Sequence, residues 1–278
     1  MSASLFDPPG PVQRRRAIIW NAISIAVIVG IATVAIRNIG QGGGLAGQYW
    51  RELYNSSVIR LVWKGMVASA KVAVLGIALS LVWGVALACG KLSSHRWIRW
   101  PARAAVEVLR GLPILILIFL LYLGLPSMGI VIPALAALVG GIAVYNGALI
   151  GEIIRGGVVA LPAGQREAAY SLGMSRFQTM SLILLPQAIR AVLPAIVSQM
   201  VVVVKESSLG FVVGYIELLQ SVRTAHEILG PGYGLPLFLL TAVIYVTVNS
   251  ILGVASRRLS ARGGGRRRAA RPDSAFTE

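Results

Sequence analysis

The stretch at residues 152–186, EIIRGGVVALPAGQREAAYSLGMSRFQTMSLILLP, is a polar, cationic segment between two apolar blocks, each long enough to cross a bilayer. Pro162 and Gly164 break the preceding helix, and residues 165–172 (QREAAYSL) are rich in strong helix formers. Gly173 follows, where a helix C-terminus needs a residue that tolerates positive φ. The stretch therefore predicts a short helix at the membrane surface, held between two membrane-spanning segments.

The composition places the whole chain in a membrane. It has 56% hydrophobic and 13% charged residues and a mean hydropathy of +0.76, whereas soluble domains carry about 25% charged residues. The net charge of +16 could indicate nucleic-acid binding. The basic residues, however, lie between apolar runs and at the chain ends, with no soluble domain to present them. We therefore expect membrane lipid, and no nucleic acid, around this protein.

The apolar runs predict an all-α, polytopic membrane protein with about six transmembrane helices. Their ranges are 17–36, 72–90, 104–125, 130–150, 186–204 and 235–255. Pro186 is expected in the first turn of the fifth helix, where its missing N–H has no intrahelical partner. The first run could instead be a cleaved signal peptide. The apolar part of a signal peptide is usually about 7–15 residues long, however, and the run at 17–36 is longer than that.

The polar segments complete the organisation. Residues 1–16 and 259–278 read as disordered basic tails, and residues 37–57 as an extracytoplasmic linker. Most of the 26 Lys and Arg residues fall on one side if both termini are cytoplasmic. Because basic residues are enriched on the cytoplasmic side of a membrane, this count places the helix around Glu167 in the cytoplasm.

The polar segment also matches a known sequence pattern. The residues Glu167, Ala168, Ala169, Gly173, Ile183, Leu185 and Pro186 are spaced as EAA, three residues, G, nine residues, I-x-L-P. This pattern resembles the EAA loop of bacterial ABC-importer permeases. The resemblance implies a five-helix permease core at about residues 58–258, one added N-terminal helix, and a cytoplasmic coupling helix that sits in a groove of a separate ATP-binding subunit.

Four flanking segments narrow the resemblance to the polar amino acid permeases of the histidine, glutamine and glutamate systems. They are Glu152-x-x-Arg155-Gly156-Gly157, Pro162-x-Gly164-Gln165, Pro186-Gln187-Ala188-x-Arg190 and Lys205-Glu206-Ser207-Ser208-Leu209. The family's R-G-T-P segment reads R-G-L-P here, and its following Gln is Leu117. Because Leu112 and Leu117 carry no polar group, no hydrogen-bonding role is carried over to them.

The resemblance implies two sets of residues in the coupling loop. ATPase coupling is assigned to Gln165, Glu167, Ala168, Ala169 and Gly173, and support of the loop to Glu152, Arg155, Gly157, Pro162, Gly164 and Pro186. Glu167 also has a simpler explanation, since the helix dipole favours a carboxylate in the first helical turn by about 0.3–1 kcal/mol.

Polar groups within the predicted spans are candidates for the substrate path or a gate, because such groups are costly in lipid. The candidates are Arg110, Asn146, Gln199, Lys205, Glu206 and Ser207. Structural alternatives remain open for several of them. Arg110 can form an ion pair with Glu107, three residues earlier. Asn146 can join helices, and residues 205–208 can cap a helix end.

The resemblance implies a permease subunit of an ATP-driven importer for a polar amino acid. Its partners would be two ATP-binding subunits, a second permease, identical or homologous, and an extracytoplasmic binding protein. No cofactor or metal is expected on this chain, because the partners bind the ATP. The N-terminal span, the DPPGP and RRR tail and the R-G-L-P variant are similar to glutamate-system permeases of high-GC Gram-positive bacteria. This favours glutamate or aspartate first, glutamine next and a basic amino acid last.

Two other classes of function were weighed. An enzyme is disfavoured because His95 and His226 are far apart in sequence and the chain has no H-E-x-x-H motif, Cys cluster or nucleophile elbow. An ion-coupled secondary transporter or channel is the stronger rival. It would need carboxylates within the membrane for ion coupling, and only Glu107 and Glu152 approach that description.

Overall fold

The computed structural model describes residues 11–41 and 46–268, and every regular element in those ranges is helical. The all-α prediction is therefore confirmed. The α-helices are α1 (Pro11–Gln41), α2 (Gly47–Arg51), α3 (Ser56–Leu92), α4 (Arg96–Gly111), α5 (Ile114–Phe119), α6 (Ala134–Val159), α7 (Ala163–Ser171), α8 (Arg176–Gln178), α9 (Leu185–Glu206), α10 (Leu218–Leu229) and α11 (Gly234–Arg268).

Short 3-10 and π-helical turns join several of these helices. The 3-10 turns are η1 (Glu52–Tyr54), η3 (Leu125–Met128), η5 (Ser207–Val213) and η6 (Pro231–Tyr233), and the π-helical turns are η2 (Leu120–Gly124) and η4 (Thr179–Leu184). Because η4 joins α8 to α9 without a break and η5 follows α9 directly, the stretch Arg176–Val213 is long enough to count as one span.

Four helical stretches of the described chain are long and apolar enough to cross a membrane: Ser56–Leu92, Ala134–Val159, Arg176–Val213 and Pro231–Ser256. A fifth span is possible if the pair Arg96–Gly111 and Ile114–Met128 is counted as one, although it bends by 106°. The bend lies between Gly111 and Ile114, where Pro113 occupies the N-cap of α5. In α1 the described apolar stretch is only Ile18–Ile31, so the added N-terminal span stays a prediction.

Several predicted boundaries were wrong. The fourth span was predicted to end at residue 150, but α6 continues to Val159 because no helix breaker occurs before Pro162. The fifth was predicted to start at Pro186, and α9 does begin at Leu185 with Pro186 in its first turn. The helical run that contains α9 starts earlier, at Arg176, where Ser175 forms a capping box with Gln178. Pro186 therefore lies inside a continuous helical run, and the π-helical turn η4 precedes it where a proline disturbs the hydrogen-bond ladder.

The predicted tails and linker are also more helical than expected. Residues 11–16 belong to α1 and residues 259–268 to α11, whereas residues 1–10 and 269–278 lie outside the described residues. The linker at 37–57 contains the end of α1, all of α2 and η1, and the first two residues of α3. Extending an existing helix adds one hydrogen bond per residue without a new nucleus, which explains why polar residues continue the long helices.

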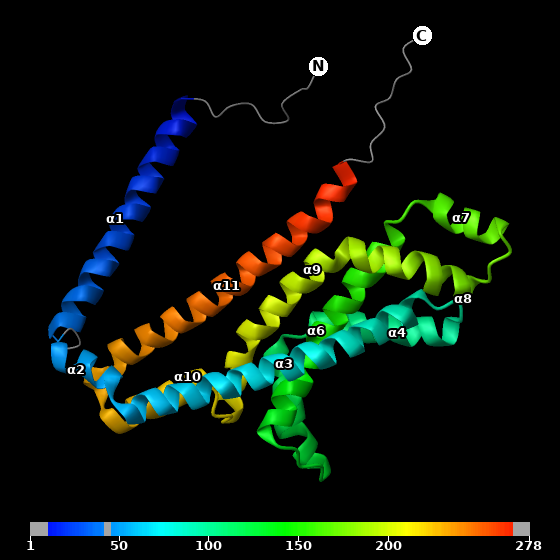
Figure 1. Cartoon of the computed structure of the whole chain (residues 1–278). Helices are drawn as coiled ribbons and strands as arrows, with labels where there is room; N and C mark the ends of the chain where they lie inside the picture. The colour runs from blue at the N-terminus through cyan, green and yellow to red at the C-terminus, as the bar shows by residue number, and fades with distance from the viewer. Residues whose placement is uncertain (1–10, 42–45, 269–278) are drawn as a thin grey trace.

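The core of the bundle is the contact between α3 and α6, which cross in Figure 1. Small residues line it. A Cβ on Gly84 of α3 would lie 2.7 Å from Ile150 Cγ2 and 3.0 Å from the Gly147 carbonyl oxygen, and a Cβ on Gly151 would lie 3.0 Å from the Gly84 carbonyl oxygen. Glycine lets helix backbones approach this closely, and in lipid, close packing is a main source of helix association.

The outward faces of the long helices are apolar. Ile28 of α1, Val82 of α3 and Val246 of α11 are 64%, 69% and 65% exposed. Such faces suit lipid rather than water. In Figure 1, α1 runs apart from the other helices, α7 lies with α4 and α8 at one end of the bundle, and α2 and α10 lie toward the other end. The short helix α7 is thus presented at one end of an apolar bundle.

Candidate coupling loop and substrate path

The short surface helix predicted at residues 165–172 is present as α7, which starts two residues earlier and ends one residue earlier than predicted. Pro162 occupies its N-cap position. At its C-terminal end Gly173 has a φ of +76°, the Gly173 N–H donates to the Tyr170 carbonyl at 2.9 Å, and the Met174 N–H donates to the Ala169 carbonyl at 3.1 Å. These bonds close the helix with a left-handed residue, which a glycine adopts without steric cost.

The predicted coupling residues of α7 fall on two different faces. Glu167, Ala168 and Gly173 are exposed. Ala169 is only 4% exposed and faces the body of the protein, because α7 packs on η4; its part in ATPase coupling stays a prediction. Gln165 is exposed, and its Oε1 accepts a hydrogen bond from Nε2 of Gln187 at 3.2 Å. Gln165 therefore also ties α7 to α9.

Two exposed apolar side chains join the same end of the molecule. Tyr170 is 43% and Leu172 82% exposed on and just after α7. Sequence reasoning missed them, since apolar residues in a membrane protein do not stand out. Their position beyond the ends of the apolar spans was the available signal, because a large apolar side chain in an interhelical loop has no core to join.

The supporting residues Glu152 and Arg155 lie on the last turns of α6. Nη2 of Arg155 lies 2.6 Å from Oε1 of Glu152, and Nζ of Lys91 on α3 lies 2.6 Å from Oε2 of Glu152. The Lys91 side chain is only 5% exposed, and Oε1 of Glu107 lies 3.7 Å from its ammonium. Glu107 thus pairs with Lys91, and the predicted pair with Arg110 is not formed.

The remaining supporting residues have different roles. A Cβ on Gly157 would lie 2.5 Å from Cγ1 of Val192, so this glycine permits contact between α6 and α9. No atom lies within 4 Å of a Cβ on Gly164, and packing gives no reason for a glycine there. Lys91 was not among the predicted site residues, because its nearest carboxylate partner, Glu152, is far away in sequence.

Three candidates for the substrate path meet between α6 and α9. Nε2 of Gln199 donates to Oδ1 of Asn146 at 2.7 Å, and Nδ2 of Asn146 donates to Oε2 of Glu206 at 2.5 Å and to the Ile142 carbonyl at 3.0 Å. Asn146 is fully buried. The amide therefore joins helices, as one of its two interpretations held, and it brings a carboxylate into the helix interface.

The other three candidates lie outside this cluster. Arg110 is exposed at the end of α4. Ser207 is buried, and its hydroxyl donates to the Val204 carbonyl at 2.8 Å. The Ser208 hydroxyl donates to the Lys205 carbonyl at 2.8 Å, so these serines close α9, as the capping interpretation held. Lys205 lies on the side of α9 that faces α11.

Glu217 is a buried carboxylate that sequence reasoning missed. It is the N-cap of α10, is fully buried, and accepts from the N–H groups of Leu219 and Gln220 at 2.9 Å. The Tyr245 hydroxyl of α11 donates to it at 3.0 Å and the Ser69 hydroxyl of α3 at 3.3 Å. Burial raises the pKa of its carboxyl, while these donors oppose the rise. Glu is not among the preferred N-cap residues, so no local pattern indicated this role.

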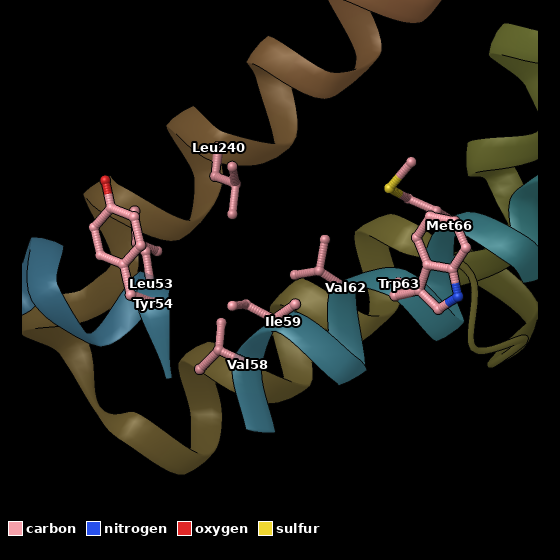
Figure 2. Close-up of a pocket in the computed structure, with 8 residues that line it drawn as sticks. All are labelled: Leu53, Tyr54, Val58, Ile59, Val62, Trp63, Met66 and Leu240. Carbon is pink, nitrogen blue, oxygen red and sulfur yellow. The ribbon is translucent and has the colours of Figure 1, made fainter. Parts of the chain in front are cut away.

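Two cavities differ in chemistry. The first, of about 380 Å³, lies between η1, α3 and α11, and its lining is apolar apart from the Tyr54 hydroxyl and the Trp63 ring N–H (Figure 2). The second, of about 400 Å³, lies between α9, α10 and α11 and contains Lys205, Tyr245 and Asn249. Only the second offers a charged group to a ligand.

Comparison with known proteins agrees with this arrangement. Residues 80–262 match the family described as "Binding-protein-dependent transport system inner membrane component". The chain belongs to this family. The glutamate transport system permease protein GluD of Corynebacterium glutamicum is 39% identical over 219 residues, which cover 77% of this chain and 80% of that protein. The probable glutamine ABC transporter permease protein GlnP of Bacillus subtilis is 34% identical over 210 residues, covering 75% and 96%.

A solved structure gives the same result for the permease fold. The crystal structure of an amino acid ABC transporter with histidines contains a chain that is 32% identical and has a TM-score of 0.66. The match covers 73% of this chain and 95% of that chain. Both the sequence resemblance and the membrane location expected from it are therefore confirmed for this permease.

Proposed function

We propose that this permease is the membrane subunit of an ATP-driven importer for a polar amino acid, with glutamate or aspartate the first choice of substrate and glutamine the second. The similarity to GluD and GlnP supports this choice. So does the similarity to a glutamate/aspartate import permease protein, GltK of Escherichia coli, at 30% identity over 194 residues.

The observation that carries the proposal is the EAA pattern on an exposed helix at one end of the bundle. Glu167 and Ala168 are exposed on α7, and Tyr170 and Leu172 add apolar surface beside them. A polar helix with exposed apolar side chains fits a groove on another protein. We assign this groove to a separate ATP-binding subunit, with α7 and both chain termini in the cytoplasm.

The complete transporter would contain two permeases, two ATP-binding subunits and an extracytoplasmic binding protein. Closure of the ATP-binding subunits would displace α7. Because α6 leads into α7 and contacts α9 at Gly157, the displacement would move both helices that hold the Asn146 cluster. In this mechanism that cluster, with Gln199 and Glu206, lies on the path that alternates between outward and inward access.

The substitution Gly173→Val tests the coupling role. Valine at a φ of +76° is strained by roughly 1–3 kcal/mol, so the end of α7 should change shape. We expect membrane insertion to be retained and substrate-stimulated ATP hydrolysis by the reconstituted complex to be lost. Gly129→Val is the matched control, because Gly129 has a φ of +81° with no atom within 4 Å of its Cβ and precedes the opposite end of α6. Normal coupled uptake by Gly173→Val would contradict the proposal.

The ion-coupled alternative is tested by the energy source. Vesicles that contain the complete complex should take up radiolabelled amino acid after collapse of the proton and sodium gradients, provided that ATP is present. Uptake that needs a gradient and ignores ATP would favour a secondary transporter. The same assay, competed with each amino acid in turn, would order glutamate, aspartate, glutamine and the basic amino acids.

A further inference from the structure

The cavity between α9, α10 and α11 has the size of a small-molecule site. Its volume of about 400 Å³ lies within the roughly 300–1,000 Å³ of ligand pockets. Leu219 and Phe238 supply apolar walls, and Lys205, Tyr245 and Asn249 supply polar groups. Most of its polar groups are already satisfied within the protein, so the unsatisfied ones indicate what a ligand would have to provide.

The first unsatisfied group is the Lys205 ammonium. Successive residues on a helix point about 100° apart, so Lys205 and its neighbour Glu206 face different ways. Glu206 is turned toward Asn146 on α6 and does not neutralise Lys205. No carboxylate in the described part of the chain lies within ion-pair distance of Lys205. Lys205 is exposed in the last turn of α9 and has no carboxylate partner there, so its ammonium is open to an anion from elsewhere.

The second is the side-chain carbonyl of Asn249. Its Oδ1 is buried and accepts no hydrogen bond, although its Nδ2 donates to the Tyr245 carbonyl at 2.7 Å. A buried acceptor without a donor costs free energy, and such groups are rare in native proteins. The other polar groups of the cavity are occupied: the Tyr245 hydroxyl donates to Glu217, and the Thr241 hydroxyl donates to the Leu237 carbonyl.

The free groups are therefore the exposed Lys205 ammonium and the Asn249 carbonyl oxygen, which is buried and would reach a ligand only after the side chain rotates. Together they complement the carboxylate and the ammonium of an amino acid. We propose that this cavity is an amino acid site in which Lys205 pairs with a carboxylate of the substrate and the Asn249 side chain turns its Oδ1 to accept a hydrogen bond from the α-ammonium. The proposal rests on the proposed function and adds α11 to the substrate path. The paired carboxylate is either the α-carboxylate or that of an acidic side chain.

The test compares glutamate with glutamine, which differ in the side-chain carboxylate alone. The complete complex, with its ATP-binding subunits and binding protein, is reconstituted in liposomes, and ATP-dependent uptake of each radiolabelled amino acid is measured well below saturating concentration. The variants are Lys205→Met, which keeps length and removes charge, and Lys205→Arg, which keeps the charge. Lys64→Met is the control, because Lys64 is an exposed lysine of α3 outside the cavity.

Loss of a hydrogen-bonded charge pair predicts that Lys205→Met lowers glutamate uptake by at least about tenfold. We expect Lys205→Arg to retain most uptake and Lys64→Met to retain all of it. A loss confined to glutamate assigns Lys205 to the side-chain carboxylate, whereas an equal loss for glutamine assigns it to the α-carboxylate. Unchanged uptake of both by Lys205→Met overturns the proposal. No uptake by the unmodified complex would instead refute the proposed function itself.

A second measurement does not depend on transport. Ser208→Cys is placed in a Cys89→Ser background, so that the cavity holds the only thiol of the chain. Glutamate at saturating concentration should slow the reaction of this thiol with a small maleimide, while Lys205→Met in the same chain should abolish the protection. An equal labelling rate with and without glutamate would overturn the proposal, as would protection by phospholipid alone.

Discussion

The glycine-lined contact between α3 and α6 gives a prediction about stability. In Gly84→Ala, the new Cβ would lie 2.7 Å from Cγ2 and 2.9 Å from Cβ of Ile150. Neither carbon is the far end of a flexible side chain, so the two helices must separate. Overpacking of this kind costs about 1–3 kcal/mol. Gly156→Ala on α6 is the control, because no atom lies within 4 Å of its Cβ.

Both substitutions gain the same helix propensity, about 1 kcal/mol for alanine over glycine, so this contribution cancels in the comparison. The steric cost alone then predicts that Gly84→Ala is less stable than Gly156→Ala by about 1–3 kcal/mol. This corresponds to a difference in melting temperature of roughly 2–12 °C. The assay is a temperature series on detergent-solubilised protein, followed by gel filtration of the surviving monodisperse fraction. The reasoning is refuted if Gly84→Ala melts at the same temperature as Gly156→Ala or above it.

Two further predictions concern buried charges and use the same assay. Glu152→Ala should lower the free energy of unfolding by about 3–5 kcal/mol, because it leaves the buried Lys91 ammonium without its nearest partner. Adding Lys91→Met to this variant should restore part of the lost stability. A double variant less stable than the single one would contradict this. Glu217→Ala should destabilise the protein by about 1–3 kcal/mol, since the donors of α10 and α11 lose their acceptor, whereas Glu217→Gln should lose less; equal losses would show that the acceptor oxygen is not what matters.

The class of fold could be predicted from the sequence because lipid imposes a simple rule: long uncharged runs become helices. The ends of the helices were harder to predict. Glu152 and Arg155 were assigned to the polar loop, yet α6 continues through both of them. Pro186 lies in the first turn of α9, as expected, yet a capped turn at Ser175 begins the helical run earlier. The contact of Glu152 with Lys91 exists only in the folded chain, whereas the capping box of Ser175 and Gln178 is a local pattern that the sequence contained.

The residues of the candidate site also fall into those that the local sequence could predict and those that it could not. The short helix α7 and the positive φ of Gly173 follow from local residues and could be predicted. The contact of Asn146 with Gln199 and Glu206 joins two helices, and the sequence named these residues without placing them together. Glu217 was missed because its role is defined by donors on α3, α10 and α11. The burial of Ala169 could not be predicted, because a spacing pattern does not tell which face of a helix is covered.

The close approach of α3 and α6 has a mechanical consequence. Where backbone meets backbone, there is no layer of side chains that can change rotamer and let one helix slide along the other. The two helices should therefore tilt as one stiff lever. The 37 residues of α3 extend about 55 Å at 1.5 Å per residue. A push on α7 at one membrane surface would then reach the opposite surface through rotation of this pair.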